Sequence, residues 1–223
     1  MNRLLAALLV LCIAVPAVAL AADTDPKKKI TAADQAKARS IVLKRTDFAA
    51  GWKKVPPSPD SDATCPGFNP DESDLTLTGE AESDFERLQG LLVVGTASEI
   101  YATKEDAVKS WTRSDKPATA RCLGYFFKQG QTTKTTKVTI VSAGRMAFPK
   151  LAPRTTAFKV VARLAVTNEG ETTTGLIAVQ LVAFGHGRGD ISLFAITPGA
   201  GIPIAQLRPL GKLLADRLAA AKL

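Results

Sequence analysis

The chain has 223 residues and a mass of 23.5 kDa, with 46% apolar residues, 22% charged residues and a formal charge of +8. This apolar share is normal for a packed globular protein and excludes a disordered chain, while the length suits a single domain, at most with a tail. One His and three Cys leave little material for a His-based metal site or for most nucleophile–base pairs, so we predict no metal, no cofactor and no catalytic residue.

The first segment, residues 1–21, has the layout of a secretory signal peptide. Arg3 gives a positive start, an uncharged and mostly apolar run follows, and Ala19-Leu20-Ala21 supplies the small residues that signal peptidase accepts. We predict cleavage after Ala21, a secreted or extracytoplasmic location, and no transmembrane helix in the mature chain. The alternative is an uncleaved membrane anchor. Cys12 lacks the small residue that a lipoprotein signal places before its Cys, so lipidation is not expected.

Removal of the signal peptide leaves two cysteines, Cys65 and Cys122. An even number of cysteines in an exported chain indicates a disulfide, because the compartment is oxidising; two free thiols are the alternative. Closing a loop of this length stabilises a fold by about 4 kcal/mol in the chain-entropy model. We therefore predict a disulfide between Cys65 and Cys122.

The mature chain should begin with a polar, disordered segment over residues 22–29, followed by a single domain over 30–223. Thr31 with Asp34 three residues later is typical of a capped helix N-terminus. This pattern predicts a helix that runs to about Arg45.

The composition changes over residues 56–88, which are rich in Pro, Asp, Ser and Gly and predict a long acidic loop. Nine acids and no base lie between residues 57 and 86: Asp60, Asp62, Asp71, Glu72, Asp74, Glu80, Glu82, Asp84 and Glu86. Oxygen-rich loops can bind Ca²⁺, but the glycine and terminal glutamate spacing of an EF-hand is absent. A solvated loop is therefore the prediction, and calcium binding is the alternative.

A strand is expected next, over residues 90–102. Thr103 with Asp106 again resembles a capping box and predicts a helix after this strand. Pro117 breaks that helix and can serve as the first residue of another, which carries Cys122 on its buried stripe. A disulfide from this helix would hold the acidic loop.

The second half of the chain predicts mainly strands. Residues 158–166 alternate apolar and polar side chains, as in a half-exposed antiparallel strand, and residues 175–184 are almost wholly apolar, as in a central strand. Further strands are expected over 138–142 and 191–196. Leucines with helical spacing then predict a C-terminal helix that either starts or is kinked at Pro209. The order α-β-α-β-β-β-β-α predicts an α+β fold, in which helices cover an antiparallel sheet.

One stretch resembles a known family. It consists of Val94–Tyr101, then Glu105-Asp106-Ala107 with Trp111 and Cys122, a strand followed by a helix and a helical Cys. It is similar to the extracellular sensor-like domains of actinobacterial receptor kinases and to related secreted lipoproteins. The resemblance implies a PsbP-like α/β/α sandwich and implies no particular ligand or binding residue. Those kinase domains generally carry two disulfides, whereas this chain has cysteines for one.

Motifs for catalysis are absent from the sequence. His186 lies in a glycine-rich turn between two expected strands, where a solvated surface residue is more common than a general base. The sequence has no Gly-x-Ser-x-Gly elbow, no His-Glu-x-x-His and no phosphate-binding glycine loop. Arg188-Gly189-Asp190 spells an adhesion tripeptide, but the predicted turn accounts for each of its residues.

Charge is unevenly distributed along the chain. Residues 57–127 carry six bases and thirteen acids, whereas residues 128–223 carry thirteen bases and four acids. Outside the cell, anionic polymers and lipid headgroups are the natural counter-charges of such a basic half. Lys159 and Arg163, at polar positions of the alternating strand, are the predicted contacts; the alternative is that they only solvate the sheet. Nucleic acid is not expected, because aromatic residues make up only 6% of the chain.

Two functions are compatible with these patterns. The favoured one is a secreted, non-catalytic binding or sensor-like domain for a small molecule, a lipid or an envelope polymer. The alternative is a hydrolase of cell-envelope polymers that uses carboxylates of residues 71–86. A pocket that brings two of these carboxylates together would favour the hydrolase, and a smooth apolar groove between sheet and helices would favour binding.

Overall fold

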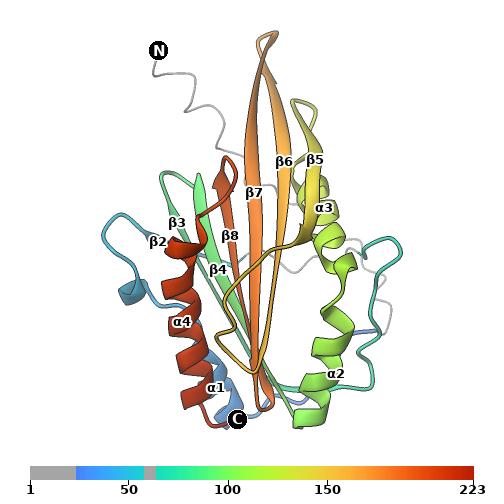
Figure 1. The fold of residues 1–223 in the computed structure, drawn as a ribbon, viewed down its shortest axis with the longest axis vertical. Coiled ribbons are helices and arrows are strands. Elements are labelled where there is room, and N and C mark those ends of the chain that lie inside the picture. The colour runs from blue at the N-terminus through green and yellow to red at the C-terminus, as the bar shows by residue number, and fades with distance from the viewer. Residues whose placement is uncertain (1–23, 58–63) are drawn as a thin grey trace.

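An eight-stranded sheet organises the chain in the computed structural model, which describes residues 24–57 and 64–223 (Figure 1). The strand order is β1-β3-β4-β8-β7-β6-β5, and β2 pairs with β3. Every pairing is antiparallel except that of β1 with β3. The strands are β1 (Lys27–Lys28), β2 (Lys53–Val55), β3 (Thr76–Arg87), β4 (Leu92–Tyr101), β5 (Thr136–Arg145), β6 (Arg154–Asn168), β7 (Glu171–His186) and β8 (Gly189–Pro198).

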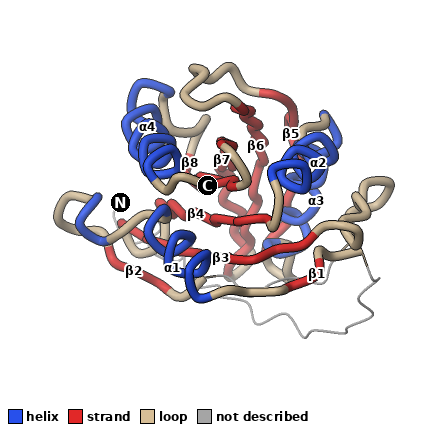
Figure 2. Tube along the Cα trace, turned by 90° about the horizontal axis from the view of Figure 1, so that it is seen from below, coloured by secondary structure: helices blue, strands red, loops and turns tan. Residues whose placement is uncertain are grey.

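Helices cover both faces of this sheet, so the predicted α+β class is confirmed. They are α1 (Ala32–Ile41), α2 (Lys104–Ser114), α3 (Pro117–Gln131) and α4 (Ile204–Ala220). Figure 2 shows α1 and α4 on one side of the strands and α2 and α3 on the other. The larger core lies under α1 and α4, where Phe184 and Leu193 of the sheet meet Leu214 of α4, all fully buried.

The predicted helix N-termini are confirmed. The hydroxyl groups of Thr31 and Thr103 accept hydrogen bonds from the backbone N–H groups of Asp34 and Asp106 and so cap α1 and α2. Pro117 is the first residue of α3, where its missing N–H costs nothing.

One helix boundary differs from the predictions. Helix α1 ends at Ile41 because Val42 is extended, and the expected continuation to Arg45 is replaced by a short 3-10 helix, Arg45–Asp47. The C-terminal helix begins at Ile204, so Pro209 lies within its second turn, as in the predicted alternative that places Pro209 inside the helix.

The loop predicted over residues 56–88 is wrong for its second half, which forms β3. The β3 side chains that face α1 and the core are small or apolar, including Gly79, Ala81, Ser83 and Phe85. Such residues give a weak hydrophobic alternation, and the acids between them point to the opposite face. The expected disorder of residues 22–29 is also incomplete, since Lys27 and Lys28 pair with β3.

The predicted disulfide between Cys65 and Cys122 is confirmed, with Cα atoms 5.5 Å apart. It fastens the segment of residues 64–75, which precedes β3, to the middle of α3. The predicted signal peptide lies outside the described residues, as do Asp60 and Asp62. Among residues 24–57 and 64–223, no helix has the length and apolar character needed to cross a membrane.

Candidate functional site

The candidate site is the face of β5, β6 and β7 that points away from α3. Along β6, side chains that point toward α3 are buried, including Val160, Ala162 and Leu164. The alternate residues Lys159 and Arg163 therefore point to the opposite face, which is the face that α4 covers further along the sheet. We call the part of this face on β5, β6 and β7 that α4 leaves exposed the open sheet face.

The open sheet face carries bases that the described part of the chain leaves without counter-charges. Strands β5, β6 and β7 contain five Lys and Arg residues and one acid, Glu171, which lies at the hairpin end of β7. Two of the bases, Arg145 and Arg154, lie on the helix side and pair with acids there. The other three, Lys137, Lys159 and Arg163, take part in no ion pair among the described residues.

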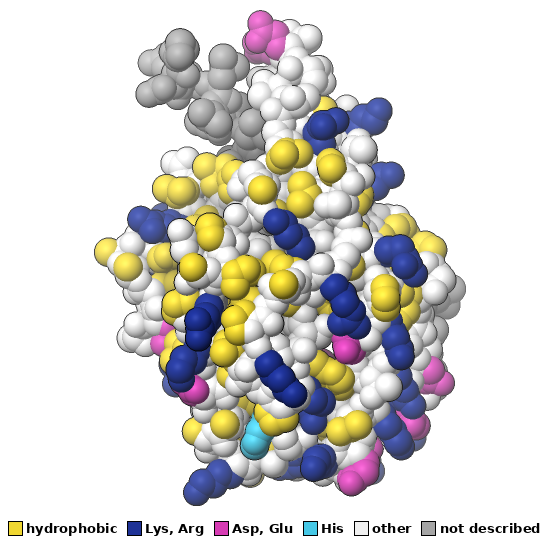
Figure 3. All heavy atoms as spheres, in the orientation of Figure 1, with side chains coloured by type: hydrophobic (Ala, Val, Ile, Leu, Met, Phe, Trp, Pro, Cys, Tyr) yellow, Lys and Arg dark blue, Asp and Glu magenta, His cyan; other side chains and the backbone are white. Residues whose placement is uncertain are grey.

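Exposed apolar side chains occur on the same strands. Leu176 lies opposite Arg163 in the register of β6 and β7 and is 41% exposed. Val141, at the irregularity in β5, is 53% exposed. Figure 3 looks onto this side of the molecule and shows Lys and Arg side chains interspersed with apolar ones, with fewer Asp and Glu. Such a face is suited to contact a partner surface that carries both negative charges and apolar groups.

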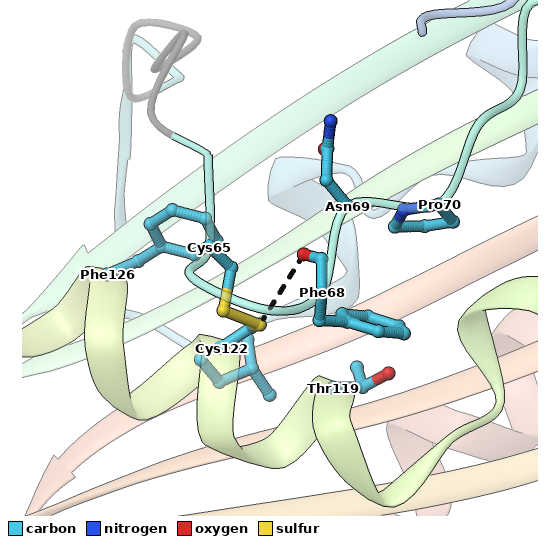
Figure 4. A pocket seen from close by; sticks show the side chains of 8 residues that line it. Cys65, Phe68, Asn69, Pro70, Thr119, Cys122 and Phe126 are labelled. Atoms are coloured by element: carbon cyan, nitrogen blue, oxygen red, sulfur yellow. Dashed lines mark hydrogen bonds between the residues drawn. A yellow bond between two sulfur atoms is a disulfide. The ribbon is translucent and has the colours of Figure 1, made fainter.

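A second feature is a small hollow beside the disulfide (Figure 4). Its volume is about 230 Å³, and it lies between the segment of residues 64–75 and one side of α3. Its lining is mostly apolar: Cys65, Phe68, Asn69, Pro70, Thr119, Cys122, Leu123 and Phe126. No residue of the sheet lines it, so it is not the groove between sheet and helices that would favour ligand binding.

The carboxylates proposed for a hydrolase make separate contacts. Asp74 accepts two hydrogen bonds from Arg113, at 2.6 and 3.0 Å, and lies 3.8 Å from the Lys109 ammonium. Glu80 pairs with Lys28 at 2.9 Å, and Asp71 accepts from the Ser73 backbone. These acids are thus engaged in holding the segment and the sheet edge. No group of three or more His, Cys, Asp or Glu suited to a metal ion occurs among the described residues.

Glu72 belongs to a different arrangement. Its carboxylate accepts a hydrogen bond from Ser110 of α2, whose hydroxyl contacts Tyr101 of β4, which in turn donates to Glu99. Burial raises the pKa of Glu72. Burial of its carboxyl group against Tyr101, with repulsion from neighbouring acids, raises the pKa of Glu99 to about 7, although the Glu99 residue as a whole is exposed, which limits this rise. The count of acids in the sequence included Glu72. Nothing in the sequence pointed to Glu99, Tyr101 or Ser110 as its neighbours.

The turn between β7 and β8 is structural. Arg188 makes a two-pronged ion pair with Asp34, and Asp190 pairs with Arg154. Both charged residues of the adhesion tripeptide are therefore used within the fold. His186 is half-buried, and its Nδ1 has no hydrogen-bond partner among the described residues.

The described residues form an α+β fold in which helices cover the sheet and a disulfide fastens one segment to α3. Comparisons with known proteins do not identify a family for it. No protein-family model matches the chain, and no curated protein matches it. Among solved structures, the chain is similar to the crystal structure of protein Ms6760 from Mycobacterium smegmatis. The identity is 12%, over 65% of this chain and 91% of that chain, with a TM-score of 0.19. A TM-score this low carries no argument about fold or function.

Proposed function

We propose that this chain is a secreted, non-catalytic binding domain that attaches to phosphate-bearing surfaces of the cell envelope through the open sheet face. The observation that carries the proposal is the group of three bases that form no ion pair with any residue the structure describes, Lys137, Lys159 and Arg163, together with the exposed Leu176 beside Arg163. The disulfide is consistent with an oxidising compartment outside the cytoplasm. The α+β class is compatible with the sensor-like domains that the sequence resembles.

The attraction should be electrostatic in its main part. A Lys or Arg close to an anionic membrane contributes about 1 kcal/mol, and this contribution falls off over about 8 Å at physiological ionic strength. Two such residues together contribute about 2 kcal/mol, which corresponds to roughly thirtyfold in the dissociation constant. Binding should therefore be strong at low salt and weaken sharply as salt is added.

The test is sedimentation of the mature protein with vesicles that contain phosphatidylglycerol, with phosphatidylcholine vesicles as the neutral reference. We expect Lys159→Gln/Arg163→Gln to weaken binding to the anionic vesicles roughly thirtyfold at low salt without changing the circular dichroism spectrum. Lys53→Gln/Lys54→Gln is the matched control, because these exposed bases of β2 lie at the other end of the sheet. It removes the same charge and should leave most of the binding.

Soluble polyphosphate in a second arm separates an anionic polymer from a lipid surface as the partner. Competition by polyphosphate at low salt would indicate that phosphate groups alone are recognised. Equal loss of vesicle binding in the two double variants would mean that only net charge matters and would remove the assignment to the open sheet face. Absence of salt-sensitive binding by the parent would overturn the proposal as a whole.

A further inference from the structure

Four side chains form a continuous line of oxygen atoms between the sheet and the segment of residues 64–75. The hydroxyl of Tyr101 lies 2.8 Å from a carboxylate oxygen of Glu99 and 2.8 Å from the hydroxyl of Ser110. The hydroxyl of Ser110 lies 2.8 Å from a carboxylate oxygen of Glu72. Three elements meet here: β4, α2 and the segment. Tyr101 is fully buried, and Ser110 is 6% exposed.

The number of protons in this line is decisive. A hydroxyl group donates one hydrogen bond, and an ionised carboxylate donates none. With Glu72 and Glu99 both ionised, two hydroxyl protons must serve three contacts. One contact then brings two oxygen atoms together at 2.8 Å with no hydrogen between them, which is costly in a buried position.

One additional proton on either carboxyl group satisfies the whole line. If Glu99 carries it, Glu99 donates to Tyr101, Tyr101 donates to Ser110, and Ser110 donates to Glu72. If Glu72 carries it, all three hydrogen bonds run in the opposite direction. Either glutamate can therefore carry the single additional proton, and all three hydrogen bonds form in both cases.

The surrounding charges favour retention of this proton. A negative charge on Glu99 is repelled by three acids: Glu72, Asp190 of β8 and Glu80 of β3. A negative charge on Glu72 is repelled by Asp25 and Asp74 and attracted by Arg113 of α2. Asp190 is itself paired with Arg154 of β6, and Glu80 with Lys28 of β1. Glu99 is an exposed residue, so the line can exchange its proton with water. This exposure moderates the rise of its pKa, but the proton count stands without that rise.

We propose that Glu72 and Glu99 together bind one proton at neutral pH, and that this proton ties the segment of residues 64–75 to α2 and β4. The segment is also anchored by the Cys65–Cys122 disulfide, the Asp74–Arg113 pair, a backbone hydrogen bond from Glu72 to Thr24 and the buried side chain of Leu75. Loss of the proton at higher pH breaks one of the three hydrogen bonds and leaves two negative charges on the same line. The site is therefore a pH-sensitive tether.

The direction of the pH effect follows from the extra proton. The folded protein binds one proton more than the unfolded chain between the ordinary pKa of a glutamate and the pKa of the pair, which is raised toward 7. Stability from the tether is fully present below the ordinary value and is lost as the pH rises through the raised one. In that window the unfolding equilibrium constant increases up to tenfold per pH unit from this proton alone.

The test is a ¹³C NMR titration of the glutamate side-chain carboxyl groups in the mature protein. In the parent, the resonances of Glu72 and Glu99 should both respond to one shared step near neutral pH. In Glu72→Gln, the new amide donates to Ser110 at every pH, so the Glu99 carboxylate gains a donor and should bind its proton at least tenfold more weakly. Glu99→Gln should have the same effect on Glu72.

A third variant separates proton sharing from simple repulsion. Tyr101→Phe divides the line, so Ser110 can donate to Glu72 without an added proton, although the charge of Glu99 remains. The pKa of Glu72 should then fall, whereas burial or repulsion alone would leave it raised. Glu105→Gln, at an exposed position of α2, is the matched control and should change neither titration.

Two results would overturn the proposal: ordinary titrations of both Glu72 and Glu99 in the parent, or an unchanged raised pKa of Glu72 in Tyr101→Phe. A separate experiment tests the tether: amide hydrogen exchange of residues 64–75, corrected for intrinsic rates, measures how often the segment opens. Local opening should be more frequent at pH 8 than at pH 6 in the parent and independent of pH in Glu72→Gln. Equal opening at both pH values in the parent would refute the tether.

Discussion

Asp34 and Arg188 form an ion pair that joins α1 to the turn between β7 and β8. Two guanidinium nitrogens of Arg188 donate to the two carboxylate oxygens of Asp34, at 2.8 and 2.6 Å, and Thr78 donates to the same carboxylate at 2.7 Å. The side chain of Asp34 is 9% exposed and that of Arg188 is 24% exposed. Removing one charge of a buried pair typically costs about 3–5 kcal/mol, because the other charge stays buried.

We expect Asp34→Asn to lower the free energy of unfolding by about 3 kcal/mol, the low end of that range. The smaller value is appropriate because Arg188 keeps some solvent contact and a second acceptor, the Tyr101 carbonyl, at 2.7 Å. Urea unfolding at pH 7, followed by circular dichroism, measures this loss. Lys212→Gln is the control: it breaks an exposed pair with Asp216 and should cost less than about 1 kcal/mol. A loss below about 1 kcal/mol in Asp34→Asn would show that the pair does not stabilise the fold.

The same ion pair predicts that the stability of the fold decreases at acidic pH. The hydrogen bond from Arg188 holds the pKa of Asp34 below its usual range, against the opposing effect of burial. An aspartate in the unfolded chain binds its proton near pH 4, so between that value and the lower folded pKa the unfolded state binds more protons. Stability from Asp34 is therefore present above about pH 4 and is lost as the pH falls below it. The difference in unfolding free energy between parent and Asp34→Asn should shrink between pH 5 and pH 3.

Two further predictions concern stability. Replacing Cys65 and Cys122 by Ser should lower the free energy of unfolding by about 4 kcal/mol, the chain-entropy value for a separation of 57 residues, and reductant should have the same effect on the parent. An unchanged thermal midpoint after reduction would contradict it. Gly95→Ala should cost about 1–3 kcal/mol, because a Cβ there would overlap the ring of Phe194. Gly144→Ala, which meets open space, is the control and should be nearly neutral, so equal losses in both variants would refute this packing argument.

The sequence predicted those elements whose residues carry a strong local signal. The caps at Thr31 and Thr103 predicted the starts of α1 and α2, and a clean alternation predicted β6. Strand β3 was missed because Gly79, Ala81 and Ser83 on its inner face look like loop residues. Their small size has a tertiary cause: Gly79 lies against the backbone of α1, where a Cβ would collide with Asp34. That contact joins residues far apart in the chain, so no local pattern reveals it.

One part of the candidate sites could be predicted from the sequence and another part could not. Alternation in β6 placed Lys159 and Arg163 on one face, but only the position of α4 shows that this face is left open. The line from Glu72 to Glu99 could not be predicted, because it joins a segment, a helix and a strand through side chains of ordinary types. Nothing in a single sequence indicates that the hydroxyl groups of Tyr101 and Ser110 lie 2.8 Å apart.

The fold resolves part of the uneven distribution of charge along the chain. Four arginines of the basic C-terminal portion pair with aspartates: Arg145 with Asp115, Arg154 with Asp190, Arg188 with Asp34 and Arg217 with Asp47. Three of those four aspartates come from the first 127 residues, so the ion pairs join the two halves of the chain. Bases used in this way are structural and are not available to a partner. The bases of the open sheet face stand apart from them because no acid of the described chain pairs with them. The proposed function supplies their counter-charge from outside the chain, as phosphate groups of the cell envelope.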